Sequence, residues 1–137
     1  MTTKTFRVEW PLRKGNKIMT THENFEFKNL AGRTLTVVKV YDNKELIEFT
    51  DSLGNRYQMY HSQNCCESVW LEDQCGSWDD IIGFPILSAH ELESEQERGC
   101  TWTFYTLVTF QGTMTLRWVG ESNGYYSESV DFYILRN

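Results

Sequence analysis

The stretch of residues 101–120, TWTFYTLVTFQGTMTLRWVG, constrains the fold more than any other part of the chain. β-Branched and aromatic residues dominate it, and these residue types favour β-strands. The turn signal at residues 111–112 lies near its middle, so the stretch predicts a β-hairpin. Trp102 lies on one face of the first strand, whereas Tyr105 and Leu107 lie on the other. Because both faces carry apolar side chains, we expect this hairpin to be central and covered on both sides.

Similar but shorter runs predict further strands on both sides of this hairpin. A second hairpin is expected at residues 45–61, where two alternating runs flank the turn sequence SLGN. The remaining strands are expected at residues 5–10, 34–41, 67–73 and 85–93, and in a last strand that contains Val130, Phe132 and Ile134. The charged run ESEQERG, residues 93–99, is predicted to be a solvated loop.

A single short helix is predicted after residue 76. Ser77 is a good N-cap, and Gly83 followed by Pro85 ends the helix. The predicted fold is therefore mainly β (α+β): a curled antiparallel sheet of about seven strands, with one short helix that closes an edge. With 137 residues, the chain fits a single domain, residues 1–137, in which residues 1–30 are weakly patterned.

The charge of the chain argues against a nucleic-acid-binding protein. The formal net charge is -6, and the basic residues are thinly spread apart from Arg13, Lys14 and Lys17. Because a nucleic-acid-binding protein usually has a basic face, we expect no direct contact with nucleic acid. Such an acidic balance is ordinary for a soluble bacterial protein; the other interpretation is an acidic surface that docks onto a basic protein partner. The sequence has no signal peptide and no apolar stretch that would cross a bilayer, so we expect a cytoplasmic protein with reduced thiols.

Residues 60–75, YHSQNCCESVWLEDQC, contain three of the four cysteines and one of the three histidines. Their spacing is H-x3-C-C-x8-C, formed by His61, Cys65, Cys66 and Cys75. Tetrahedral Zn2+ sites use Cys and His as donors, so we predict that these four residues bind a structural zinc ion. The ion would connect the second hairpin, the next strand and the start of the helix. Its removal would loosen the middle of the chain.

The adjacent cysteines leave alternatives open. Neighbouring residues of an extended strand point to opposite sides, so Cys65 and Cys66 share an ion only where the backbone turns between them. Otherwise one of them packs in the core, and Cys100, His90, Asp73 or water supplies the fourth donor. The other interpretations are a strained vicinal disulfide, buried inert cysteines or a reactive thiol.

A catalytic metal is the alternative function. It requires three protein ligands, an open position for water and a nearby base, for which Glu67 or Asp73 would serve. The chain would then be a small zinc-dependent hydrolase that acts on a nucleotide or a peptide. The sequence has no HExxH motif and no P-loop, and three thiolates would make zinc a poor Lewis acid. We therefore expect a protein without catalytic residues.

Three segments of the chain resemble a family of small uncharacterised proteins of bacteriophages and prophages. The segments are MYHSQNCCESVWLED, WDDIIGFPILSAHE and TWTFYTLVTFQGTMTLRWVGESNGYYSESVDF. The most specific motifs are H-x3-C-C-E at residues 61–67, D-D-x-x-G-x-P at residues 79–85 and SNGYYSESV at residues 122–130. The resemblance covers residues 31–134 as a family-like core, and residues 1–30 fall outside it as a variable N-terminal segment.

This resemblance implies no activity by itself, but some members of the family resemble anti-CRISPR proteins that act on type II systems. It implies a phage counter-defence protein that binds the Cas nuclease of the host and blocks the loading of nucleic acid without catalysis. Cas nucleases hold nucleic acid in strongly basic channels, which an acidic domain would occupy. We therefore expect tight binding that weakens as the salt concentration rises.

Overall fold

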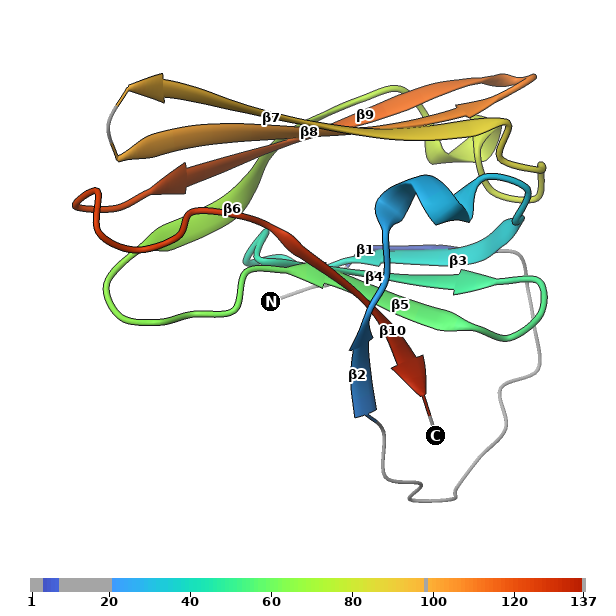
Figure 1. The fold of residues 1–137 in the computed structure, drawn as a ribbon. Coiled ribbons are helices and arrows are strands. Elements are labelled where there is room, and N and C mark those ends of the chain that lie inside the picture. The colour runs from blue at the N-terminus through green and yellow to red at the C-terminus, as the bar shows by residue number, and fades with distance from the viewer. Residues whose placement is uncertain (1–3, 8–20, 98, 137) are drawn as a thin grey trace.

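The computed structural model describes the backbone of residues 4–7, 21–97 and 99–136, and the side chains of residues 21–94 and 99–136. The described strands are β1 (Lys4–Arg7), β2 (Thr21–Asn24), β3 (Leu35–Val40), β4 (Leu46–Asp51), β5 (Arg56–Tyr60), β6 (Ser68–Cys75), β7 (Ser88–Glu97), β8 (Cys100–Thr109), β9 (Gly112–Glu121) and β10 (Asp131–Arg136). They form two antiparallel sheets that pack face to face (Figure 1). The six-stranded sheet has the order β1-β3-β4-β5-β10-β2, and the four-stranded sheet has the order β6-β9-β8-β7.

The strands bury alternate side chains, as the sequence pattern predicts. In β4 and β5, Ile47 pairs with Met59 and Phe49 pairs with Tyr57, and all four side chains are at most 1% exposed. The inner face of the four-stranded sheet contributes Trp118 and Leu116 to the same core. Burial of these two inner faces is what holds the sheets together.

Both predicted hairpins are confirmed. The β4–β5 hairpin turns at residues 52–55, where Gly54 adopts a φ of 86°, a conformation that glycine reaches at little cost. The β8–β9 hairpin turns at residues 110–111, because Thr109 and Gly112 are already a pair of the ladder. The turn therefore begins one residue earlier than predicted.

The predicted single curled sheet and its helix are wrong in detail. The structure has ten described strands in two sheets, and the expected helix is a 3-10 turn, η2 (Trp78–Asp80). The Ser77 hydroxyl accepts a hydrogen bond from the Asp79 amide, so the predicted N-cap is confirmed. The helix stops early because the backbone amide of Gly83 donates to the Leu35 carbonyl of β3. This pairing draws the chain into contact with the other sheet before a longer helix forms.

Two further expectations about the four-stranded sheet are wrong. Strand β7 continues to Glu97, which pairs with Cys100, so most of the expected loop at residues 93–99 is strand. The outer face of β8 is not covered by another layer of described residues, and Trp102 and Phe104 are only partly buried there. Arg117 contributes to the cover of this face by lying 4.8 Å from the centre of the Trp102 ring.

Residues 21–30 belong to the sandwich. Strand β2 pairs with β10, and the 3-10 turn η1 (Phe27–Leu30) places Phe27 and Leu30 in the core. Of the strand expected at residues 5–10, residues 4–7 form β1, and residues 8–10 lie outside the described part of the chain. None of the described helical segments has the length or apolar character needed to cross a membrane.

Candidate functional site

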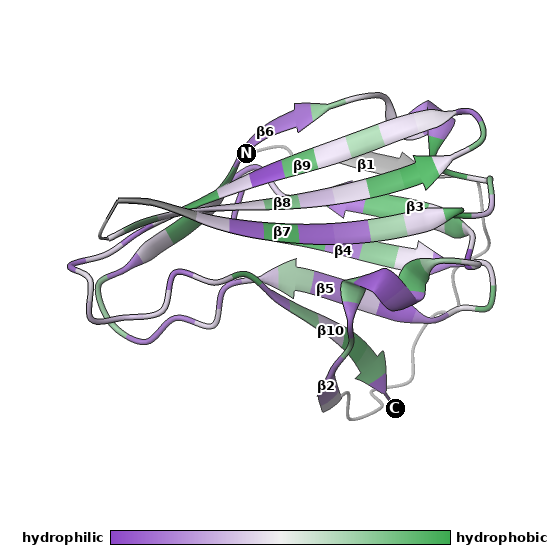
Figure 2. Cartoon of the chain, turned by 45° about the horizontal axis from the view of Figure 1, so that its top comes forward, coloured by the Kyte–Doolittle hydropathy of each residue, from purple (hydrophilic) through white to green (hydrophobic). Residues whose placement is uncertain are grey.

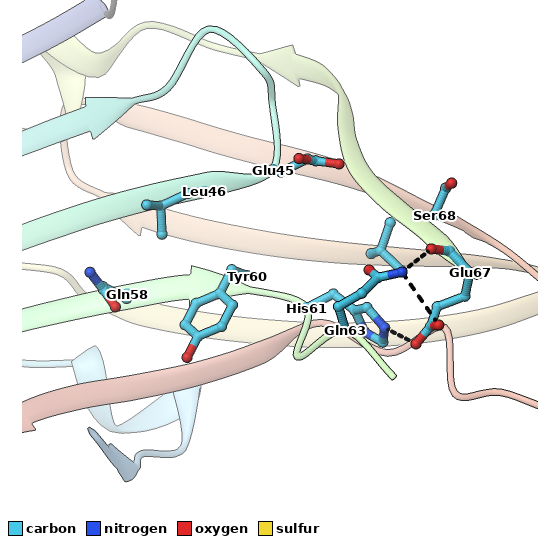
Figure 3. Close-up of a pocket in the computed structure, with 9 residues that line it drawn as sticks. Glu45, Leu46, Gln58, Tyr60, His61, Gln63, Glu67 and Ser68 are labelled. Atoms are coloured by element: carbon cyan, nitrogen blue, oxygen red, sulfur yellow. Dashed lines mark hydrogen bonds and ion pairs between the residues drawn. The ribbon is translucent and has the colours of Figure 1, made fainter. Parts of the chain in front are cut away.

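The segment between β5 and β6, residues 61–67, forms one wall of a pocket of about 560 Å3 (Figure 3). Strand β5 contributes Gln58 and Tyr60 to this pocket, and the start of β4 contributes Leu46 beside Glu45. The lining combines two carboxylates and two side-chain amides with a tyrosine ring and aliphatic side chains. Such a mixture is typical of a binding pocket.

His61 and Glu67 form a buried ion pair in the wall of this pocket. Their Nε2 and Oε2 atoms lie 2.6 Å apart, and their side chains are only 4% and 0% exposed. The other ring nitrogen of His61, Nδ1, lies 2.6 Å from the carbonyl oxygen of Ser129. Both partner oxygens accept hydrogen bonds, so both ring nitrogens donate, which the imidazolium form of His61 satisfies.

Glu67 also closes the loop that precedes it. Its carboxylate accepts hydrogen bonds from the backbone amides of Asn64 at 3.0 Å and Cys65 at 2.8 Å. The hydrogen bond from His61 holds the pKa of Glu67 at about 2, against the effect of burial and with the help of these amides. Gln63 donates a further bond, at 2.5 Å, to the backbone carbonyl of Glu67. Together these bonds fix the loop from both of its ends.

This loop presents Cys65 and Cys66 to solvent. Both side chains are exposed, and the chain bends at both residues. A hydrogen bond to the Cys65 sulfur raises the pKa of the Cys66 thiol. A hydrogen bond to the same sulfur raises the pKa of the Tyr126 hydroxyl, which comes from the loop before β10. The chain therefore bends at the two adjacent cysteines and is not an extended strand there.

Cys75 lies far from these two cysteines. It is the last residue of β6, is exposed, pairs with Thr115 and lines a separate cavity of about 140 Å3. Cys75 is the eighth residue of β6, which begins at Ser68, two residues after Cys66. At roughly 3.3 Å per residue, the strand places Cys75 about 20 Å from its start, whereas zinc–sulfur bonds are only about 2.3 Å long.

The other donors considered from the sequence are also dispersed. Asp73 pairs with Arg117 at 3.7 Å, His90 is exposed on β7, and Cys100 is partly buried at the start of β8. Among the described side chains, no three His, Cys, Asp or Glu residues gather into a group that would hold a metal ion. The structure thus brings Cys65 and Cys66 together but not His61 or Cys75, and the four-residue zinc site stays a prediction.

The role of the sequence motif at residues 120–124 is clear only from the structure. Residues 120–124, GESNG, match the G-x-S-x-G pattern of hydrolases, in which the serine lies between a strand and a helix. Here β9 ends at Glu121, and residues 122–136 form no helix. The Ser122 hydroxyl donates to the Glu128 carboxylate and accepts from the Gly124 amide. Ser122 therefore organises its own loop.

Two functional contacts were not apparent from the sequence. The partner of His61 is Glu67. Both residues belong to the H-x3-C-C-E motif, but the motif alone does not indicate that they bond to each other. The partner of Cys65 is Tyr126, from a loop distant in sequence. Contacts of the second kind leave no local pattern, since they depend on how two loops at the same end of the sandwich are arranged (Figure 1).

A comparison with known protein families found a match that covers most of the chain. A family model described as a domain of unknown function (DUF7448) matches residues 28–132. No curated protein and no solved structure matches the chain. The matched residues include the pocket and the loop of residues 61–67, whereas β1 and β2 lie outside the match.

Proposed function

We propose that this chain, which belongs to the DUF7448 family of domains of unknown function, is a non-catalytic binding domain that docks its acidic surface onto a basic protein. The partner that we propose is a type II Cas nuclease of a bacterial host, whose nucleic-acid channels are basic. Occupation of such a channel would block the loading of nucleic acid and would require no chemistry. The resemblance of the sequence to phage proteins supports this choice of partner, and the charge of the sandwich supports the mode of binding.

The distribution of charge is the observation on which this proposal rests. Residues 21–94 and 99–136 contain 16 acidic and 7 basic residues, a net charge of -9. Residues 1–20 contain five basic residues and one acidic residue. The net charge of -6 for the whole chain therefore understates the acidity of the sandwich. The negative electrostatic field of the sandwich favours the approach of a positively charged partner.

Most of the basic side chains in the described region are neutralised locally. Five of the seven have a nitrogen 3.0–3.7 Å from a carboxylate oxygen: Lys28, Arg33, Arg56, Arg117 and Arg136. A sixth, Lys39, lies over the ring of Tyr41, with its Nζ atom 4.6 Å from the ring centre. Most of the excess carboxylates therefore have no basic partner of their own among the described side chains and act together on a partner protein.

Strand β7 is where we expect part of this contact. It is an edge strand of the four-stranded sheet, and Figure 2 shows hydrophilic residues along much of it. Glu91 and Glu93 are exposed on this edge. Burial against the neighbouring strand raises the pKa of Glu91, and a nearby basic side chain of a partner would offset that cost. An edge strand also offers unpaired backbone groups to a partner.

Titration of the purified protein into a Cas nuclease bound to its guide RNA tests this function. We expect DNA cleavage to stop at one molecule of inhibitor per nuclease, and the affinity to fall as the salt concentration rises. The double variant Glu91→Gln/Glu93→Gln should bind more weakly and show a smaller dependence on salt. Inactivation at far less than one molecule per nuclease would instead indicate catalysis and would contradict the proposal.

A matched control is available in the same chain. Glu23 and Glu26 are also exposed carboxylates, but they already pair with Arg136 and Lys28. The variant Glu23→Gln/Glu26→Gln changes the net charge by the same amount, and we expect it to bind more tightly than the β7 variant. Equal loss of binding in both variants would mean that total charge, and not β7, determines the contact.

A further inference from the structure

We propose that the cavity between the open edges of the two sheets binds the guanidinium group of an arginine side chain on the basic partner, an inference that rests on the proposed function. The cavity has a volume of about 720 Å3, which lies within the usual range for a binding site. Most of its lining comes from β7 in one sheet and from β2, η1 and β10 in the other (Figure 1). Both β7 and β2 are edge strands, so no further described strand closes the cavity there. The cavity shares no lining residue with the pocket beside His61.

Aromatic rings form the inner part of this cavity. The ring centre of Phe27 lies 4.7 Å from that of Tyr105 and 5.4 Å from that of Phe132, and the three side chains are at most 7% exposed. Phe25 also belongs to the lining and is only partly buried. Aromatic rings attract cations to their faces, and the planar guanidinium group also stacks on them. Phe25 is therefore the ring that offers accessible surface to a bound cation.

Two carboxylates in the same lining have no basic partner among the described side chains. Glu91 of β7 accepts a hydrogen bond at its Oε1 atom from the Tyr105 hydroxyl at 3.2 Å. Asp131 of β10 accepts a hydrogen bond from the backbone amide of Ser62 at 3.0 Å. The one lysine of the lining, Lys28, already pairs with a neighbouring carboxylate at 3.0 Å. Glu91 and Asp131 therefore give the cavity a negative charge that a cation would neutralise.

The position of Glu91 brings this charge close to the aromatic rings. The bond from the Tyr105 hydroxyl places the Glu91 carboxylate beside the ring that packs against Phe27. Partial burial raises the pKa of Glu91, although the bond from Tyr105 acts in the opposite direction. A cation stabilises such a carboxylate, because it replaces part of the hydration that burial removes. The cavity thus offers one side chain both a charged acceptor and aromatic surface.

Arg33 of the same chain shows how a guanidinium group is held by such a combination. Its Cζ atom lies 5.2 Å from the centre of the Phe25 ring, and its guanidinium group lies 3.3 Å from the Asp51 carboxylate. Arg33 does not line the cavity, so the part of the Phe25 ring that faces the cavity stays uncovered by it. Arginine is also the preferred side chain for binding phosphate groups, so the basic channel of the proposed partner would supply it.

NMR spectroscopy of the isotope-labelled protein, titrated with the peptide acetyl-Gly-Arg-Gly-amide, tests the proposal. We expect saturable shifts of the backbone amides of Glu91, Tyr105 and Phe132. The same peptide with citrulline in place of arginine keeps the shape but has no charge, and we expect it to bind roughly 10-fold more weakly. The peptide with lysine should bind roughly 3-fold more weakly, because an ammonium group lacks the planar fork of donors.

Glu93 provides a matched control within the protein. It lies two residues after Glu91 on the same side of β7 and is also exposed, but it lines a different cavity of about 230 Å3. Glu91→Gln should weaken binding of the arginine peptide roughly 3- to 10-fold, the effect of losing one charge-assisted hydrogen bond. Glu93→Gln should change it by less than about 2-fold. The NMR spectrum of each variant shows whether it folds.

Three results would overturn the inference: no saturable shifts around the cavity, equal binding of the citrulline or lysine peptide, or equal loss of binding in Glu91→Gln and Glu93→Gln. No nuclease enters this titration, so its failure differs from a failure of the proposed function. A chain that inhibits the nuclease without binding the peptide refutes the arginine site alone. A chain that binds the peptide without inhibiting the nuclease refutes the proposed function alone.

Discussion

Strand β5 has a buried carboxylate beyond each of its ends, and the two carboxylates organise two different kinds of loop. Asp51 precedes the turn of residues 52–55, and Glu67 follows the loop of residues 61–66. Each accepts hydrogen bonds from two backbone amides of its loop and from one cationic side chain. The same arrangement therefore serves a tight turn in one place and the wall of a pocket in the other.

The cationic partners distinguish the two sites. Asp51 pairs with Arg33, which is always charged, and also accepts bonds from the Tyr57 hydroxyl and the Asn55 amide side chain. Glu67 pairs with His61, whose charge depends on the proton it binds. The Asp51 turn displays Leu53, which is 81% exposed, whereas the Glu67 loop displays two thiols. The comparison indicates that a buried carboxylate marks a constrained loop, and that the groups the loop exposes determine its chemistry.

Removal of the Asp51 carboxylate should give the largest loss of stability. Asp51→Ala leaves Arg33 and the buried Tyr57 hydroxyl without their acceptor, so we expect a loss of about 3 kcal/mol in the free energy of unfolding. Urea unfolding followed by tryptophan fluorescence measures this change. Asp79→Ala removes an exposed carboxylate and should change the stability by less than about 0.5 kcal/mol. Similar values for the two variants would show that the Asp51 turn is not constrained as the structure indicates.

Replacement of Glu67 by glutamine should change how stability depends on pH. The pKa of Glu67 is about 2 in the folded protein, below the ordinary value of 4.5 for a glutamate side chain, so the folded state binds fewer protons. Its contribution to stability is complete above pH 4.5 and is lost as the pH falls toward 2. We therefore expect Glu67→Gln to be less stable than the unmodified protein at neutral pH, with a difference that shrinks as the solution is acidified.

Urea midpoints at a series of pH values measure this effect, and Asp51 provides the comparison. Hydrogen bonds from Asn55 and Tyr57 lower the pKa of Asp51 below 3.8, although burial acts in the opposite direction. The contribution of Asp51 to stability should therefore persist to lower pH before it begins to fall. A constant difference between Glu67→Gln and the unmodified protein across the acidic range would contradict the assigned role of His61.

Removal of the Tyr57 hydroxyl should reduce the free energy of unfolding by less than the substitutions of Asp51 and Glu67. The hydroxyl donates to Asp51 at 2.8 Å and accepts from Arg33 at 2.8 Å, and burial together with Asp51 raises the pKa of Tyr57. In Tyr57→Phe the carboxylate keeps its amide donors, so we expect a loss of about 1 kcal/mol. Tyr133→Phe is the control, because its hydroxyl bonds only to an exposed serine among the described residues. An equal loss in both variants would argue against the Asp51 network.

Truncation of Gln63 should have the smallest effect on stability of the four substitutions. Its side chain is exposed and donates to the backbone carbonyl of Glu67, so Gln63→Ala should cost less than about 0.5 kcal/mol. Hydrogen exchange of the Asn64 and Cys65 amides distinguishes the effect of the Gln63 contact from the effect of the Glu67 carboxylate. We expect faster exchange in Glu67→Gln and nearly unchanged exchange in Gln63→Ala. Equally fast exchange in both would mean that Gln63 holds the loop as firmly as the Glu67 carboxylate does.

The parts of the fold predicted from the sequence are those set by neighbouring residues. The hairpin at residues 45–61 was predicted because alternating apolar residues flank a glycine turn, and the structure confirms it. The helix expected after Ser77 is a 3-10 turn, because tertiary pairing of Gly83 with Leu35 outweighs the capping signal. At the candidate site, the grouping of Cys65 with Cys66 follows from adjacency. The separation of Cys75 follows from its position as the last residue of the eight-residue strand β6.

The sequence by itself determined the alternation of side chains in the two hairpins, the position of their turns to within one residue and how acidic the chain is. Tertiary structure alone decided that the strands divide into two sheets, that His61 bonds to Glu67, and that Tyr126 reaches Cys65. The physical reason is one of range. Alternation and turn propensity act over a few residues, whereas strand order and buried polar contacts depend on burying both apolar faces while pairing most of the buried hydrogen-bonding groups.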